Sequence, residues 1–235
     1  MRRIGLITGL GPVSSVDYYL GIINGFRERK STSHYPEICM FNVDMERMFQ
    51  YANAKDYESV AMYFAESITR LQRSGASAAA ICCNTLHIAF DFLLPKSALP
   101  LISIVDTTCD EILRKGYKKV LLLGTKFTMD SDLYTKPLCA RGIDVAVPDP
   151  TSRQRVHSII FPRLEEGIVD DIDKKELLQI ANDIILSQQS DAVILGCTEL
   201  PLMIKAGDLP VPLVNTLDVH VNAILDYLLK DSTSL

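Results

Sequence analysis

An internal duplication constrains the fold of this 235-residue chain more than any other feature of its sequence. A run of apolar residues followed by a glycine-containing turn occurs at 4–9 and again at 120–125, and Gly9 and Gly124 are 115 residues apart. Self-similarity at a fixed spacing indicates that a chain is built from repeated structural units. One short match is weak by itself, so the interpretation depends on further matches in the same order.

Two further pairs of segments keep nearly the same spacing. Residues 78–85 resemble 192–198, and the second cysteine of the first segment aligns with Cys197, 114 residues further on. Residues 99–106 resemble 211–218 at a spacing of 112. Three matches in order predict two similar halves, each carrying a glycine turn and a cysteine directly after a strand.

Short β-branched or leucine-rich runs alternate with stretches of helical periodicity, which is typical of a parallel sheet covered by helices. The clearest helical patterns lie at 57–74 and 175–188. We therefore predict an α/β fold of two similar parallel-sheet domains related by approximate two-fold symmetry, with the active site in the cleft between them. The expected strands are 4–8, 78–82, 101–105, 120–123, 192–195 and 213–214.

Composition excludes several classes of function. The formal net charge of -5 gives no broad basic surface, so nucleic acid is not an expected partner. No apolar stretch approaches the roughly 18 residues of a membrane span, and the first residues resemble a strand and turn rather than a signal peptide. The six cysteines form no CxxC pair and no Cys/His cluster at zinc spacing. We expect a cytoplasmic protein without a membrane partner or a metal site.

Cys83 and Cys197 both follow predicted strands, at the ends where parallel sheets bind ligands. Inverting an amino-acid α-carbon requires one group to remove a proton and a second group to deliver one to the opposite face. A thiol has an ordinary pKa of about 8.5 and can serve as either group. Asn84, Thr85 and Thr198 follow the cysteines and supply donors for a carboxylate and for developing charge.

The glycine turns supply a second set of candidate residues. Gly9 and Gly11 allow the backbone after the first strand to approach a ligand closely. Gly124, Thr125 and Thr128 occupy the equivalent place in the second half. We predict that both turns contribute to substrate binding.

Four motifs then resemble those of the aspartate/glutamate racemase superfamily. Residues 83–87 (Cys-Asn-Thr-Leu-His) and 196–201 (Gly-Cys-Thr-Glu-Leu-Pro) are similar to its two cysteine signatures. Residues 9–12 (Gly-Leu-Gly-Pro) and 123–129 resemble its first-strand turn and second-domain turn. The resemblance spans nearly the whole chain and adds Leu10 to the expected substrate-binding residues.

This resemblance implies a racemase that needs no pyridoxal phosphate or other cofactor and uses two thiols. It implies a first domain at 1–98, completed by a returning C-terminal segment at 211–235, and a second domain at 99–210. It also implies a homodimer that acts on a small acidic amino acid and can form a D-amino acid. Lys126 as a Schiff-base lysine is not expected, because only Gly124 and Thr125 lie near it as a phosphate cradle.

Two positions indicate a branch within the superfamily. Glu199 stands where glutamate racemases usually carry histidine, which resembles the aspartate racemase branch and makes Glu199 a candidate substrate-binding residue. Arg47 loosely matches an arginine that holds the substrate side-chain carboxylate in archaeal-type enzymes, whereas acidic residues at 163–167 replace the lysine expected there. That acidic stretch resembles bacterial racemases of broad specificity or of L-aspartate and L-glutamate.

Three alternatives remain open from the sequence. A cis-trans isomerase of a dicarboxylate such as maleate would use one cysteine as a covalent nucleophile. A hydantoin-type racemase is a close relative, and a non-catalytic amino-acid sensor would bind its ligand without turnover. The roles of His87 and Glu199 are also open: His87 either orients Cys83 or fills the interior, and Glu199 either bonds near Cys197 or caps a helix.

Overall fold

The structure of the protein is a computed structural model that describes residues 2–230. Residue 1 and residues 231–235, which the sequence analysis assigned to the first domain, lie outside the described residues. The chain divides into two compact units, here called unit 1 and unit 2. Unit 1 contains the described residues up to Ile104 and those from Leu217 onward, and unit 2 contains Val105–Thr216.

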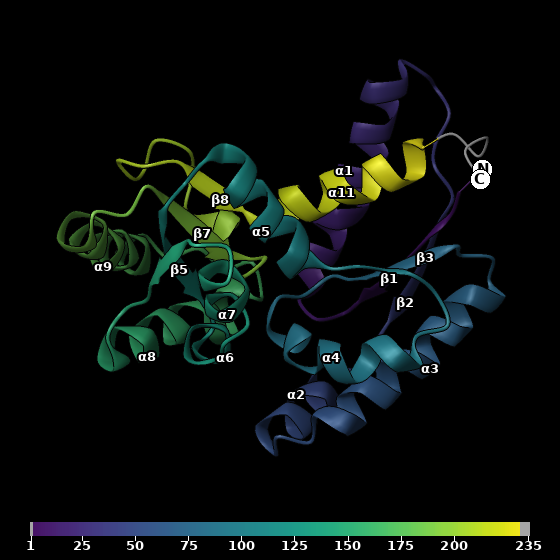
Figure 1. Cartoon of the computed structure of the whole chain (residues 1–235), viewed down its shortest axis with the longest axis horizontal. Coiled ribbons are helices and arrows are strands. Elements are labelled where there is room, and N and C mark those ends of the chain that lie inside the picture. The colour runs from purple at the N-terminus through teal and green to yellow at the C-terminus, as the bar shows by residue number, and fades with distance from the viewer. Residues whose placement is uncertain (1, 231–235) are drawn as a thin grey trace. The chain divides into compact units, whose positions relative to one another are not determined.

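Unit 1 is built around a parallel four-stranded sheet of order β2-β1-β3-β4 (Figure 1). Its strands are β1 (Ile4–Thr8), β2 (Ile38–Asn42), β3 (Ala78–Ile81) and β4 (Leu101–Ile102). Its helices are α1 (Pro12–Lys30), α2 (Met45–Asn53), α3 (Tyr57–Arg73), α4 (Phe90–Leu93) and α11 (Thr216–Leu229), with short 3₁₀ helices η1 (Thr85–Ala89) and η2 (Leu94–Lys96).

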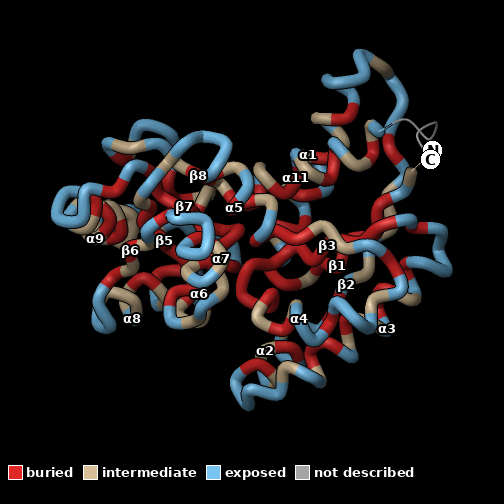
Figure 2. Tube along the Cα trace, in the orientation of Figure 1, coloured by how far each residue is buried: buried red, intermediate tan, exposed pale blue. Residues whose placement is uncertain are grey.

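The strands of unit 1 send alternate side chains to two separate cores, because successive residues of a strand point to opposite faces of the sheet. Ile4 and Leu6 pack with Tyr18 of α1 and with α11 on one face. Ile7 and Ile81 pack with α2 and α3 on the other face. Figure 1 shows the two helix layers on opposite sides of this sheet, and Figure 2 shows the central strands β1 and β3 as buried.

Unit 2 repeats the same strand order as β6-β5-β7-β8, again entirely parallel. Its strands are β5 (Lys119–Gly124), β6 (Asp144–Ala146), β7 (Ala192–Gly196) and β8 (Leu213–Asn215). Its helices are α5 (Ile104–Lys115), α6 (Lys126–Asp130), α7 (Thr135–Cys139), α8 (Pro150–Ile159), α9 (Asp171–Gln188) and α10 (Leu200–Met203), and a π-helical segment η3 (Ile160–Leu164) continues α8.

Local sequence signals explain where the two longest expected helices begin. The Asp56 side chain accepts a hydrogen bond from the Ser59 amide at the start of α3, and Asp170 accepts from the Ile172 and Asp173 amides at the start of α9. Both aspartates are N-caps, the position that supplies an acceptor for the first free amides of a helix. Among residues 2–230, no helix is both long enough and apolar enough to span a membrane.

The predicted fold class is confirmed as two parallel α/β units of similar build. Two strands were missed, β2 and β6, and both lie at an edge of their sheet. The chain crosses between units after Ile104 and after Thr216. The expected boundaries, after residues 98 and 210, precede these crossings because β4 and β8 each pair with the strand before them and stay in that sheet.

Candidate active site

The turn between β1 and α1 is held in place by hydroxyl side chains. Ser15 Oγ accepts a hydrogen bond from the Gly9 amide (3.1 Å) and donates one to the Gly11 carbonyl (2.7 Å). Ser14 Oγ donates to the same carbonyl at 3.2 Å. Gly9 and Gly11 have φ angles of 81° and 133°, which glycine adopts far more readily than other residues. Gly9, Leu10 and Gly11 therefore form a fixed turn, in which Leu10 is buried.

Asn42, at the carboxyl end of β2, packs directly against this turn. A Cβ atom on Gly9 would lie 2.6 Å from Asn42 Oδ1, and Asn42 Nδ2 donates to the Val43 carbonyl at 3.3 Å. Asn42 was not among the predicted site residues, because β2 was not among the expected strands. The signal for it was the apolar run at 38–41, which Asn42 ends.

Cys83 lies in the loop after β3, beside the end of β1. The amide of Cys82 donates to the Ile7 carbonyl at 3.0 Å, which fixes the start of this loop against β1. Cys83, Asn84 and Thr85 are all at least nine-tenths buried. The structure therefore brings the predicted thiol and its two neighbouring donors to the same edge of the sheet as the glycine turn.

His87 bonds to the backbone of Cys83. Its Nδ1 lies 2.7 Å from the Cys83 carbonyl oxygen, and because a carbonyl only accepts, Nδ1 carries the proton. The imidazole stacks on Phe90, and burial lowers the pKa of His87 to about 4, so the ring is neutral at pH 7. Its Nε2 is buried without a hydrogen-bond partner. The hydrogen bond from His87 Nδ1 to the Cys83 carbonyl oxygen holds the loop that carries Cys83.

Arg47 lies in the first turn of α2, which Asp44 caps by accepting from the Arg47 amide at 3.3 Å. Its exposed guanidinium donates from Nε to Tyr51 Oη at 3.2 Å and lies 5.2 Å from the ring centroid of Tyr63. These contacts are with α2 and α3, and none of them joins Arg47 to the turns after β1 and β3. The aromatic partners fix the guanidinium at this surface.

In unit 2, β5 and β7 end side by side at two glycines. Gly124 and Gly196 are paired across the strands, and a Cβ atom on Gly124 would lie 2.9 Å from the Gly196 carbonyl oxygen. Thr125 then caps α6, because its Oγ1 accepts from the Thr128 amide at 3.3 Å. The hydroxyls of Thr125 and Thr128 lie 3.2 Å apart, and both residues are buried.

Cys197 follows β7 directly and its thiol contacts a carboxylate. Cys197 Sγ donates to Glu199 Oε2 at 3.1 Å, and Thr198 Oγ1 donates to the same oxygen at 2.9 Å. Glu199 therefore bonds to the thiol, and its side chain does not cap α10. Burial, together with the negative charge of Glu199, raises the pKa of the Cys197 thiol well above its ordinary value.

A second buried acid, Glu165, lies near this group and was not predicted as a site residue. It follows η3, is 6% exposed, and its Oε2 has no hydrogen-bond partner. Burial and the charge of Glu199 raise the pKa of Glu165 to about 7. The acidic stretch at 163–167 was the available signal, but the sequence did not show which of its two glutamates is buried; Glu166 is exposed.

The remaining cysteines differ from Cys83 and Cys197 in position. None of the six is in a disulfide, and burial raises the pKa of Cys82 well above its ordinary value and that of Cys109 to about 12. Cys139 is exposed at the end of α7. Within residues 2–230, no group of three or more His, Cys, Asp and Glu is arranged to hold a metal ion.

Chemically, each unit offers a thiol directly after its third strand in spatial order, beside a turn rich in backbone and hydroxyl donors. In unit 2 the thiol donates to a carboxylate, which suits a group that gives and regains a proton. In unit 1 the loop around Cys83 contains the amide and hydroxyl of Asn84 and Thr85, which suit a carboxylate or an enolate-like charge.

Comparison with known proteins gives consistent matches along nearly the whole chain. The model of the family described as Asp/Glu/hydantoin racemase matches residues 7–224. The broad specificity amino-acid racemase RacX of Bacillus subtilis is 24% identical over 91% of this chain and 92% of its own length. The glutamate racemase of Sulfurihydrogenibium is 25% identical over 92% of this chain and 81% of its own length.

Solved structures show the same similarity in three dimensions. An aspartate racemase homologue from Pyrococcus horikoshii OT3 superposes with a TM-score of 0.84 at 34% sequence identity. That alignment covers 97% of this chain and 99% of the other.

Proposed function

This chain belongs to the Asp/Glu/hydantoin racemase family, and from that premise we propose that it racemises aspartate, glutamate or both without a cofactor, using Cys83 and Cys197 as its two bases. Membership of this family supports amino-acid racemisation as the activity of this chain. The names of the relatives cover broad specificity, glutamate and aspartate, which is why the proposal includes both acidic amino acids.

One observation carries the two-base proposal. Cys83 lies two residues after the end of β3, and Cys197 directly follows β7. These two strands hold the same place in two sheets of identical order. Two groups of the same chemical type at equivalent positions suit a reaction in which the two directions must mirror each other. Cys82 and Cys109 lack this combination, since Cys82 has no counterpart in unit 2 and Cys109 lies within α5.

In the proposed reaction, one cysteine as thiolate removes the α-proton, and the other as thiol delivers a proton to the opposite face of the carbon. The backbone of Gly9–Gly11, the donors Asn84 and Thr85, and the threonines 125, 128 and 198 hold the substrate carboxylates and the negative charge that develops on them. Arg47 is proposed to bind a carboxylate at the surface of α2. Glu199 contacts Cys197 and acts on the thiol.

The first experiment follows the α-proton by NMR. L-aspartate and L-glutamate are incubated separately with the protein in D₂O without added cofactor, and loss of the α-proton signal reports exchange. We expect exchange with at least one of them, accompanied by formation of the D-enantiomer. Absence of exchange on both amino acids would contradict the proposed substrate class and would direct attention to dicarboxylates.

Cysteine variants test the mechanism in the same assay. Cys83→Ser and Cys197→Ser should each abolish racemisation, whereas Cys139→Ser is a matched control at an exposed thiol and should retain it. Retained racemisation in either site variant would refute the two-base mechanism. A covalent adduct on one sulfur, with maleate as substrate, would instead identify cis-trans isomerisation.

We also propose a homodimer acting in the cytoplasm. The cytoplasmic location is supported by the proposed chemistry, because two thiols that exchange protons must stay reduced and reducing compartments keep them so. Light scattering coupled to size exclusion tests the assembly: twice the mass of one chain supports the dimer, and the mass of a single chain refutes it.

A further inference from the structure

The thiol of Cys197 lies in an unusually acidic and enclosed environment. Glu199 Oε2 already accepts two hydrogen bonds, one from Cys197 Sγ at 3.1 Å and one from Thr198 Oγ1 at 2.9 Å. Its other oxygen, Oε1, is buried without a partner. Glu165 Oε2 is buried and unpartnered in the same way, and the charge of Glu199 acts on Glu165.

Two buried carboxylates with unsatisfied oxygens are unfavourable when both are ionised. Each unpaired acceptor pays a desolvation cost, and two like charges in a poorly solvated site repel each other. One proton held between the two groups removes one of the charges and gives a donor to an oxygen that has none. A carboxyl pair of this kind titrates as a unit.

Cations on the neighbouring elements do not neutralise the pair. Arg163, two residues before Glu165, pairs with Asp170 and Asp173. Lys205, which follows α10, donates to the Pro201 carbonyl. The groups whose charges act on Cys197 are Glu199 and Glu165, and both are acidic.

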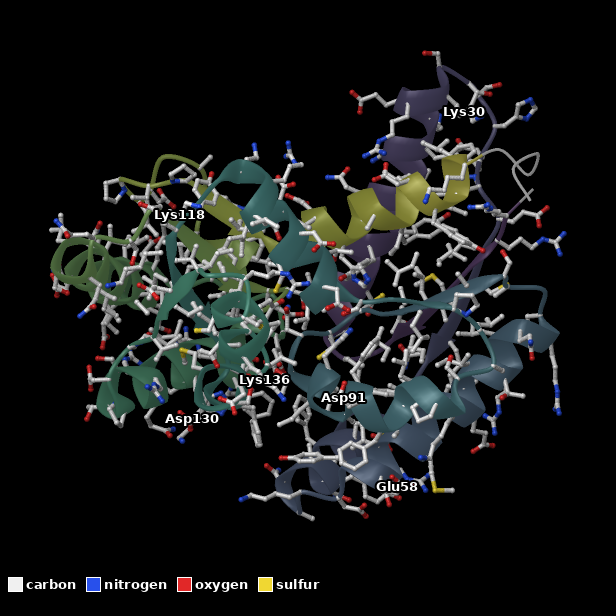
Figure 3. The ribbon with its side chains drawn as sticks, in the orientation of Figure 1. Lys30, Glu58, Asp91, Lys118, Asp130 and Lys136 are labelled. Atoms are coloured by element: carbon white, nitrogen blue, oxygen red, sulfur yellow. The ribbon has the colours of Figure 1, made fainter. Side chains whose placement is uncertain are left out.

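The cation that follows β5 is also engaged elsewhere. Lys126 pairs with Asp130, the residue labelled in Figure 3 near α6 and α8. Arg153 of α8 bonds to the same carboxylate at 2.9 Å. These cations therefore leave the two acids beside Cys197 with two charges when both are ionised, and one retained proton reduces them to one.

We propose that Glu165 and Glu199 share one proton beside Cys197, and that this pair keeps Cys197 as a thiol between turnovers and returns a proton to its sulfur afterwards. Glu199 touches the reacting sulfur, whereas Glu165 acts through Glu199 and is a positioning residue. The inference rests on the proposed function, because the carboxyl pair returns a proton to Cys197 during turnover only if Cys197 exchanges protons with a substrate.

The proton balance of the step is complete. When Cys197 delivers its S–H proton to the substrate carbon, the sulfur becomes a thiolate beside two acids. The shared carboxyl proton moves to the sulfur, which restores the S–H bond and leaves both carboxylates ionised. Cys83, which took the α-proton, releases it to water, and the carboxyl pair regains one proton from water, so that all three groups return to their starting states. Because Cys197 is kept as a thiol, Cys83 is the cysteine that rests as thiolate in the free enzyme.

The test is the alkylation of Cys197 by iodoacetamide in the absence of substrate, followed by mass spectrometry of the Cys197 peptide across a range of pH. Only the thiolate reacts, so the rate reports the protonation of the sulfur. At pH 8, above the raised pKa of Glu165, the unsubstituted pair has lost its shared proton and carries two negative charges. Glu165→Gln and Glu199→Gln each leave one charge, and we expect each to speed alkylation at that pH about tenfold, equivalent to a fall of one unit in the thiol pKa. In the unsubstituted protein, Cys83 should react faster than Cys197.

Glu166→Gln is the matched control, because Glu166 is exposed and adjacent in sequence. It should leave the rate at Cys197 unchanged. Rates at Cys197 that are equal in all the Gln variants, or slower in Glu165→Gln, would overturn the proposal. If circular dichroism shows that either Glu165→Gln or Glu199→Gln does not fold, the alkylation rate of the other variant tests the proposal. The relative alkylation rates of Cys83 and Cys197 in the unsubstituted protein test it independently.

A kinetic measurement separates proton return from a purely structural role. Because proton return follows the chemical step, Glu165→Gln should lower kcat more than kcat/KM, while Glu166→Gln changes neither. Equal loss in both parameters would assign Glu165 to substrate binding or folding. If the protein racemises neither amino acid, the alkylation shift still tests the shared proton, so failure of the two proposals can be told apart.

Discussion

At the scale of single residues, the two halves of the chain use the same thiol in different surroundings. The backbone of Cys83 is held by His87, four residues later, whereas the thiol of Cys197 itself donates to Glu199, two residues later. A neutral imidazole adds no charge to its loop, while a carboxylate favours the protonated thiol. Equivalent positions in the duplicated fold therefore place the two thiols in unequal surroundings, as the proposed reaction with one thiolate and one thiol requires.

Substituting Gly9 tests how firmly the first turn is specified. Gly9→Ala places a Cβ atom against Asn42 in a backbone conformation with φ of 81°. Gly142→Ala is the control, because Gly142 has φ of 74° but open space around it. Conformational strain should lower the free energy of unfolding by about 1–2 kcal/mol in both variants. The clash should cost Gly9→Ala about 1 kcal/mol more, as measured by urea unfolding.

In the double variant Gly9→Ala/Asn42→Ala, the free energy of unfolding should recover only the part that the clash with Asn42 removed. The part lost to strain should not be recovered, because the strained φ remains. Equal unfolding free energies for Gly9→Ala and Gly142→Ala would show that the turn adapts without involving Asn42.

The sequence allowed prediction of those site residues whose roles follow from their own position along the chain. Cys83, Cys197 and the turns at Gly9 and Thr125 each follow a strand, and the duplication reveals that pattern. Glu165 could not be predicted in this way, because its burial beside Glu199 results from the packing of η3 and α10, which are far apart in the sequence. Which of the proposed residues contact substrate stays a prediction.

At the scale of elements, α1 and α11 pack closely in unit 1 because α1 presents glycines to its partner. Gly21 faces Val221, and Gly25 faces Leu225. Tyr18 Oη donates to His220 Nδ1 at 2.8 Å, and His220 Nε2 donates to the Ile102 carbonyl at 2.9 Å. This contact attaches the returning C-terminal helix to the sheet of unit 1.

Alanine at the two glycines separates helix propensity from packing. Both substitutions should gain about 1 kcal/mol, since alanine favours a helix interior over glycine. At Gly21 the new Cβ atom would lie 3.3 Å from Val221 Cγ1, which small shifts accommodate, whereas at Gly25 it would overlap Leu225 Cδ1. We expect Gly25→Ala to be less stable than Gly21→Ala by about 1–3 kcal/mol in urea unfolding. The reverse order would show that Leu225 moves aside at no cost.

The strands missed from the sequence were β2 and β6, which lie at one edge of each sheet, whereas β4 and β8 at the other edges were expected. β1, β3, β5 and β7 are nearly fully buried apolar runs and were expected, whereas β2 is only partly buried and β6 has three residues. An edge strand has a neighbour on one side only, so its sequence needs less continuous hydrophobicity. The helices α3 and α9 were predicted to within a few residues because their apolar periodicity is long.

At the scale of the whole molecule, the two units should respond to pH in opposite directions. Unit 1 buries His87 and His220, and burial lowers their pKa values to about 4 and about 3. The unfolded chain binds these protons near pH 6.5, so the stability of unit 1 falls as pH decreases below that value. In unit 2 the pKa of Glu165 is raised to about 7, so its contribution is complete below about pH 4.5 and is lost as pH rises through 7, while burial lowers the pKa of His157 and offsets part of this change.

Pulsed alkylation during urea unfolding can follow each unit separately, because the buried thiols Cys82 and Cys109 belong to unit 1 and unit 2. From pH 7.5 to pH 5.0, with the pulse at one fixed pH, the midpoint at Cys82 should fall and that at Cys109 should rise, each titrating group contributing about 2 kcal/mol. His87→Asn should weaken the first change and Glu165→Gln the second. A pH response at Cys109 that is identical with and without Glu165 would refute the assignment, because the proton retained by that carboxyl is then not the source of the effect.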